Sequence, residues 1–144
     1  MNLTGIIGRP VLDLSSATTI GRVDDVVVDA SERRVVGFLL GKVTGTATWL
    51  TWDAMTALGA DAITIDGVGD LQPTPEGTHG LKGAKALGGR VLTDGGRELT
   101  ALVDLDVDPT SGAVTALSLG DRTLPAEALI GIGSYATVVA DPEG

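Results

Sequence analysis

The 144-residue chain has no cysteine, one histidine and few aromatic side chains, which make up 3% of its residues. The absence of cysteine excludes disulfide bonds, thiol catalysis and thiolate metal sites. The only histidine, His79, lies in a glycine-rich segment that fixes no acid or nucleophile beside it, so we expect no acid–base catalysis by this residue. Because the remaining residues assemble no catalytic set and no cluster of metal ligands, we expect a protein that is not an enzyme and binds no metal or cofactor.

Basic residues are also scarce, since 10 Lys and Arg stand against 19 Asp and Glu for a net charge of −9. Direct binding to nucleic acid or to an anionic membrane surface requires clustered cations, so we expect neither. The sequence has no apolar run of about 20 residues that could span a bilayer, and its start does not resemble a signal peptide. We therefore expect an acidic, cytoplasmic protein without a membrane span, and the Ala-, Gly- and Val-rich composition suggests a bacterial source.

The most informative feature of the chain is that it repeats itself. Three blocks of the first half match three blocks of the second half in the same order: 7–12 with 87–92, 20–41 with 99–120, and 53–62 with 127–136. The longest pair aligns without a gap, so that Asp25 corresponds to Asp104. Three matches in one order indicate a duplication. We therefore expect two tandem small β-barrels, over 1–66 and 81–144, joined by a Gly- and Pro-rich linker over 67–80 with little structure of its own.

Each copy is expected to contain five to six short strands and one short helical turn, the pattern of a small barrel that closes on itself. The expected strands are 11–12, a long strand that ends at 29, 35–40, 49–51 and 62–65 in the first copy, and 91–92, a long strand that ends at 108, 114–119, 122–124 and 136–139 in the second. The helical turns are expected over 53–58 and 126–130. The alternation of apolar residues with aspartates over 103–108 predicts that Val103 faces the core and Asp104 faces solvent.

The first copy reads Ile7-Gly-Arg-Pro-Val-Leu-Asp13, then Ile20-Gly-Arg-Val-Asp-Asp-Val-Val-Val-Asp29, and after a turn Arg34-Val-Val-Gly-Phe-Leu-Leu40. This pattern resembles the PRC-barrel family, which takes its name from the H subunit of the purple bacterial photosynthetic reaction centre. The family also includes the C-terminal domain of a ribosome-maturation factor. The second copy departs from the pattern where Thr100 and Ala101 replace Gly21 and Arg22. The resemblance implies a non-enzymatic β-barrel adaptor that docks on other proteins, with no shared catalytic residues.

Two pairs of residues are candidates for binding a partner. Trp49 and Trp52 are the only tryptophans and lie on the expected edge strand and turn of the first copy, and tryptophan is enriched at binding hot spots. The second copy has Ala126 opposite Trp52, so the barrel does not require a ring there; the alternative is that one or both rings fill the first barrel. Arg33 and Arg34 form the second pair, which either docks an acidic partner or is a solvated hairpin tip.

We therefore predict a protein–protein interaction module that binds an unidentified protein partner. Its contact surface would be the groove between the barrels or the edge that carries the two tryptophans. One alternative is a small-molecule-binding or sensing protein with a pocket in or between the barrels. Another is an accessory factor in ribosome or RNA processing that acts through a protein partner. The apolar strands carry no convergent polar residues, which favours the interaction module. A homodimer, and exchange of barrels between two chains, remain open.

Overall fold

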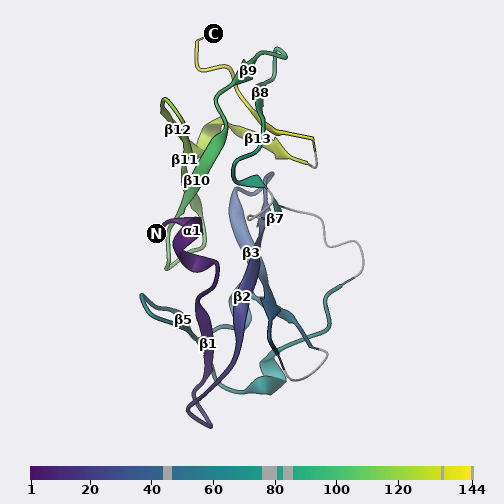
Figure 1. The fold of residues 1–144 in the computed structure, drawn as a ribbon, viewed down its shortest axis with the longest axis vertical. Coiled ribbons are helices and arrows are strands. Elements are labelled where there is room, and N and C mark those ends of the chain that lie inside the picture. The colour runs from purple at the N-terminus through teal and green to yellow at the C-terminus, as the bar shows by residue number, and fades with distance from the viewer. Residues whose placement is uncertain (44–46, 76–80, 83–85, 134, 144) are drawn as a thin grey trace.

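The computed structural model describes residues 1–43, 47–75, 81–82, 86–133 and 135–143. Its architecture is all-β and barrel-like, as the sequence predicts (Figure 1). The elements of the first half are α1 (Leu3–Ile6), β1 (Pro10–Asp13), β2 (Thr18–Asp29), β3 (Arg34–Gly41), β4 (Trp49–Thr51), η1 (Trp52–Ala54), β5 (Ala57–Leu58), β6 (Ile63–Ile65) and η2 (Val68–Asp70). Those of the second half are β7 (Leu81–Lys82), β8 (Val91–Thr93), β9 (Glu98–Leu99), β10 (Leu102–Val107), β11 (Val114–Leu119), β12 (Thr123–Pro125), η3 (Ala126–Ala128), β13 (Leu129–Ile132) and β14 (Thr137–Val139).

The two halves pair their strands in closely similar ways. In the first half the strand order is β4-β3-β2-β1-β6-β5, with β7 beside β2. In the second half the order is β10-β11-β12 in one sheet and β13-β14-β8-β9 in another. One pair of each half is parallel, β1 with β6 and β8 with β14. Strands β4 and β11 have the predicted bounds, whereas the predicted helical turns are shorter: they end at 54 and 128, where the chain continues into strands β5 and β13.

The expected alternation in β10 is wrong at Val103 and Asp104, because the strand contains a β-bulge there, whereas Leu105 and Val107 are buried as predicted. Val103 is 54% exposed, whereas Asp104 is 8% exposed. The register with β11 shifts between Leu102 and Asp104, and an extra residue in one strand turns the side chains that follow to the other face. The equivalent shift in β2 lies between Val23 and Asp25. In both bulges the aspartate accepts a hydrogen bond from the amide of the next residue at 2.8 Å.

The first part of the expected linker is ordered, so the prediction of little structure is wrong for residues 67–72. Residues 68–70 form the 3-10 turn η2, and Leu71 is 8% exposed. Gln72 pairs with Trp49 through two backbone hydrogen bonds, of 2.8 and 2.9 Å. These contacts close the first half beyond the predicted boundary at 66. His79 lies outside the described residues.

The leading segment of each half pairs with the long strand of the other half. In the first, the amide of Val107 in β10 donates to the carbonyl oxygen of Met1 at 2.8 Å. In the second, β7 lies antiparallel to β2, with Leu81 opposite Val28. Val28 and Val107 are equivalent in the repeat, so the two exchanges are equivalent as well. Figure 1 shows α1 beside β10 of the second half, and α1 also contacts β2 of its own half.

The halves also meet at a nearly symmetric contact between β3 and β11. Arg34 bridges to Ala113, and these two residues are equivalent in the repeat. The amide of Val35 donates to the carbonyl oxygen of Gly112 at 2.8 Å, and the amide of Val114 donates to that of Arg33 at the same distance. A contact between equivalent residues is the geometry of an isologous dimer interface. The halves are therefore related by an approximate two-fold axis that passes through this contact.

The interior is a single cluster of buried apolar side chains drawn from both halves. Phe38 and Leu50 of the first half and Leu105 and Leu117 of the second are all fully buried. Sharing one core enlarges the buried fraction of two modules that would each be small. Among the described residues, no helix is long and apolar enough to cross a membrane.

Candidate functional site

Both tryptophans are buried, which corrects the expectation of an open contact edge at Trp49 and Trp52. Trp49 lies on the edge strand β4, as predicted, but its side chain is 6% exposed. Its ring packs against Gly37, where an added Cβ would lie 2.6 Å from the Trp49 Cη2 atom. Glycine on β3 thus leaves the space that the ring fills. Trp49 lies outside the buried core cluster, whereas Trp52 belongs to it, so of the two rings it is Trp52 that fills the interior.

Trp52 connects the two halves. Its side chain is 8% exposed, and its ring centroid lies 5.9 Å from that of Phe38 in a tilted arrangement. The ring also covers Gly112 of the second half, where an added Cβ would lie 3.0 Å from Cε2. Gly112 has a φ of +78°, a conformation that side chains other than glycine rarely adopt. Trp52 is therefore a packing residue of the junction.

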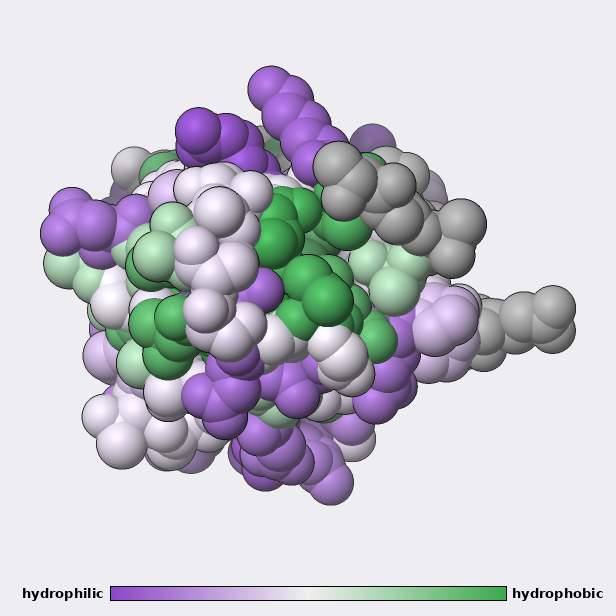
Figure 2. Space-filling model, turned by 90° about the horizontal axis from the view of Figure 1, so that it is seen from below, coloured by the Kyte–Doolittle hydropathy of each residue, from purple (hydrophilic) through white to green (hydrophobic). Residues whose placement is uncertain are grey.

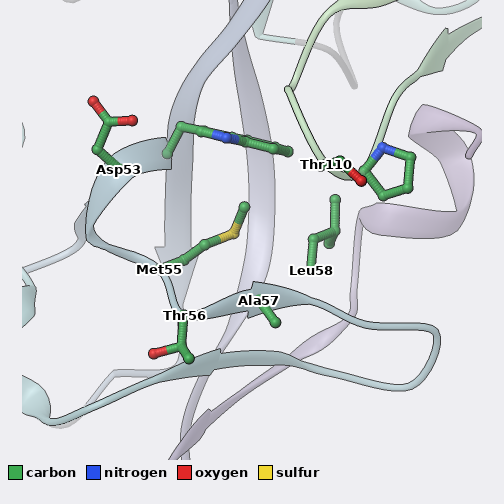
Figure 3. Close-up of a pocket in the computed structure, with 8 residues that line it drawn as sticks. Asp53, Met55, Thr56, Ala57, Leu58 and Thr110 are labelled. Atoms are coloured by element: carbon green, nitrogen blue, oxygen red, sulfur yellow. The ribbon is translucent and has the colours of Figure 1, made fainter.

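An open pocket of about 520 Å³ lies beside Trp52, between the two halves. We call it the inter-half groove; its lining residues are Trp52, Asp53, Met55, Thr56, Ala57, Leu58, Pro109 and Thr110. In Figure 3 the side chains of Met55 and Leu58 point into the groove, and Thr110 lies on the opposite wall. Asp53 and Thr56 point away from it at the rim. The groove therefore combines apolar side chains that point into it with polar groups at its edge.

The first half supplies one wall of the groove and the second half supplies the other. The 3-10 turn η1 and strand β5 carry residues 52–58, and the turn between β10 and β11 carries Pro109 and Thr110. Asp108 fixes this turn, because its carboxylate accepts hydrogen bonds from the backbone amides of Thr110 and Ser111 at 2.8 and 3.4 Å. The predicted groove between the barrels thus exists, and Trp52 forms part of its wall.

The alternative of a solvated hairpin tip is wrong for Arg33, which is used within the chain, and its role in binding a partner stays a prediction. Its Nε donates to the carbonyl oxygen of Leu129 and its Nη2 to that of Glu127, both at 3.1 Å. The backbone of Arg33 has a φ of +54°, and its side chain reaches the second half. Arg34 is half-buried in β3 and bridges to Ala113 through its backbone. A role for Arg34 in binding a partner stays a prediction.

The aspartates with a lowered pKa stabilise turns and the junction. The hydroxyl of Ser15 lowers the pKa of Asp13, and the hydroxyl of Ser31 lowers that of Asp29. The hydroxyl of Thr115 lowers the pKa of Asp106. Each of these carboxylates accepts a short hydrogen bond from a neighbouring hydroxyl, which favours the charged form. Within the described part of the chain, no three Asp, Glu or His side chains converge as metal ligands.

A second apolar surface lies at the end of the first half. Figure 2 views this end and shows hydrophobic residues grouped among hydrophilic ones. Leu14, which follows β1, is 48% exposed, and Val68 in η2 is 59% exposed. The two segments are neighbours, since the amide of Leu14 donates to the carbonyl oxygen of Ile65 at 2.9 Å. Exposed apolar side chains of this kind occur on many monomers, so the inter-half groove is the better candidate site.

The family of the chain follows from its first half. A family model of the PRC-barrel domain matches residues 1–72. The match ends at Gln72, the residue that pairs with Trp49 and completes the first half. No curated protein matches the chain. Because the family model covers half of the sequence and the fold is the expected barrel, this chain belongs to the PRC-barrel domain family.

Proposed function

We propose that this protein is a non-enzymatic interaction module that binds a protein partner in the inter-half groove. The observation that carries the proposal is the open pocket between η1, β5 and the turn at Pro109 and Thr110. Membership of the PRC-barrel family supports it, since a PRC-barrel domain is an interaction-type module. The partner, its biological process, a homodimeric state and a cytoplasmic location stay predictions.

The shape of the groove favours a protein partner over an enclosed small molecule. Small-molecule sites bury most of their ligand's surface, whereas this groove is partly open to solvent. Its lining combines Trp52 with Met55 and Leu58, and aromatic residues and methionine are enriched at protein interfaces. Apolar side chains inside a polar rim are the usual arrangement of a protein contact. A protruding side chain of the partner would fill the space.

Site-specific photo-crosslinking tests this proposal, because the approximate two-fold axis offers a matched control. Thr110 lies on the wall of the groove, and Ser31 is its equivalent at the other hairpin; both are exposed. A photoreactive phenylalanine analogue replaces one residue or the other, and adducts formed in the native cytoplasm are identified by mass spectrometry. We expect position 110 to yield an adduct with a second protein that position 31 does not yield.

Three other outcomes contradict the proposal. The same adducts from both positions would show that contact is not specific to the groove. No protein adduct from either position would remove its main support. A metabolite that raises the melting temperature of the wild-type protein, together with no protein adduct, would favour the small-molecule alternative.

A further inference from the structure

Two equivalent places lie across the junction of the halves, one an open groove and the other occupied by Arg33. In the repeat, Arg33 corresponds to Gly112, and Trp52 corresponds to Ala126. On one side Arg33 reaches over η3, the turn that contains Ala126. On the other side Gly112 has no side chain, and the Trp52 ring lies over it. A large and a small residue have thus changed sides across the junction.

The contacts of Arg33 show what binds at the occupied place beside η3. The guanidinium of Arg33 donates from two nitrogens to two backbone carbonyl oxygens, those of Glu127 and Leu129, each at 3.1 Å. Arginine suits this geometry because its planar guanidinium presents several donors in fixed directions. The carbonyl oxygens are held by the 3-10 turn and the strand start that follows it. Arg33 therefore acts as an internal ligand of the second half.

The residues equivalent to these two acceptors line the open groove. Asp53 corresponds to Glu127 and Met55 corresponds to Leu129, and both line the inter-half groove. They occupy the same places relative to η1 that Glu127 and Leu129 occupy relative to η3. The chain supplies no arginine here, because the position equivalent to Arg33 is Gly112.

We propose that the inter-half groove binds an arginine side chain of the protein partner, in the place equivalent to that of the Arg33 guanidinium. The proposal specifies the occupant of the groove and so rests on the function proposed above. Trp52 is largely buried but lines the groove, and it places an aromatic ring beside a guanidinium bound there. Met55 and Leu58 provide an apolar surface for the methylene stem. The net charge of −9 and the exposed Asp53 at the rim favour a cationic partner.

Methyl NMR on the full-length protein tests the proposal without knowledge of the partner. The chain has two methionines, so the Met55 methyl resonance is readily assigned and the Met1 methyl serves as an internal reference. N-acetyl-arginine amide is the probe, and the corresponding lysine and leucine compounds are its controls. We expect the arginine compound to shift the Met55 resonance in a saturable way. The dissociation constant from this titration should be at least several times lower than that of the lysine compound. Equal shifts with the three compounds, or none with the arginine compound, would overturn the proposal.

Two variants use the symmetry of the junction. The double variant Trp52→Ala/Gly112→Arg copies the Arg33 and Ala126 pair into the open groove, and we expect it to lose the shift. Arg33 adopts a φ of +54° at the equivalent position, so this turn accommodates an arginine at the conformational cost of a left-handed backbone. Arg33→Gly is the complement, and we expect it to create a second arginine site that shifts the Leu129 methyl resonances. If the double variant does not fold, the Arg33→Gly variant and the comparison of probes still decide the question.

Failure of this proposal is distinguishable from failure of the proposed function. A protein adduct at position 110 without a response to the arginine compound means that a partner binds through a different side chain. In that case the interaction module stands and the arginine site is rejected. A response to the arginine compound without any protein adduct at position 110 means that the groove recognises a guanidinium ligand that no protein partner supplies, which rejects both.

Discussion

Trp52 of the first half and Gly112 of the second half are in close contact, since a Cβ added to Gly112 would lie 3.0 Å from Cε2 of the ring. The equivalent pair across the approximate two-fold axis is Ala126 and Arg33, in which the small residue and the large residue have changed sides. The junction is therefore symmetric in its backbone and asymmetric in its side chains. The asymmetry leaves one groove open, and the backbone symmetry indicates what the open groove can bind.

The contact between Trp52 and Gly112 predicts a large effect for Gly112→Ala. The left-handed backbone costs alanine about 1 to 2 kcal/mol, and overpacking against the ring adds about 1 to 3 kcal/mol. Gly96 is the matched control, because its φ is +86° but nothing lies within 4 Å of its Cβ position. Urea denaturation should show a clearly larger loss of unfolding free energy for Gly112→Ala than for Gly96→Ala. Equal losses of unfolding free energy would mean that the packing of the Trp52 ring does not require a glycine at position 112.

The exchange of leading segments predicts energetic coupling between Thr4 and Asp104. The Thr4 hydroxyl donates to the Asp104 carboxylate at 2.5 Å and the Thr4 amide donates to it at 3.2 Å, which ties α1 to the second half. Asp104→Ala should lower the free energy of unfolding by about 1 to 3 kcal/mol. In a double-mutant cycle with Thr4→Val, we expect a coupling energy of about 1 kcal/mol. Strict additivity would contradict the packing of α1 on β10.

The internal use of Arg33 predicts that lysine cannot replace it. Arg33→Lys loses at least one of the two hydrogen bonds to the carbonyl oxygens of Glu127 and Leu129, and the unfolding free energy should fall by about 1 to 2 kcal/mol. Arg34→Lys, at the neighbouring position, should change it by less than about 0.5 kcal/mol. Chemical denaturation of the two variants measures both values. Similar values for the two would show that the Arg33 guanidinium does not join the halves.

Acid should weaken the hairpin between β2 and β3. The Ser31 hydroxyl and then the Glu32 amide hold the pKa of Asp29 below its ordinary value of 3.8. A lowered folded-state pKa adds stability that is complete above 3.8 and is lost as the pH falls through the folded-state pKa. Ser31→Ala should therefore raise the pKa of Asp29 and reduce this acid dependence, as an NMR titration of the Asp29 carboxyl carbon would show. An unchanged titration curve would contradict the assigned cause.

The sequence predicts the strands well where the pairing is regular. The bounds of β4 and β11 follow from short apolar runs between turn residues, and the two long hairpins follow from the same pattern. The orientation of Val103 and Asp104 does not follow, because alternation assumes one residue opposite one residue and the bulge inserts another. A repeat shows which residues are equivalent, but not whether Leu81 pairs with its own half or with the other.

The candidate site was predictable only in part, because its side chains are placed by contacts between residues far apart in the sequence. The groove between the halves and the involvement of Trp52 follow from the repeat and from the scarcity of aromatic residues. The burial of Trp49 depends on Gly37, which lies on a neighbouring strand and is not marked by any local pattern. The replacement of Arg33 by Gly112 is visible in the alignment, but its consequence depends on the contact across the junction.

Crosslinking in the presence of a competing small compound tests the proposed arginine site most directly. Crosslinking from position 110 is repeated with N-acetyl-arginine amide or its lysine counterpart present at a saturating concentration. We expect the arginine compound to abolish the adduct with the partner and the lysine compound to leave most of it, because partner and compound occupy the groove beside Trp52 and Met55. An adduct whose yield is unchanged by the arginine compound would contradict the account.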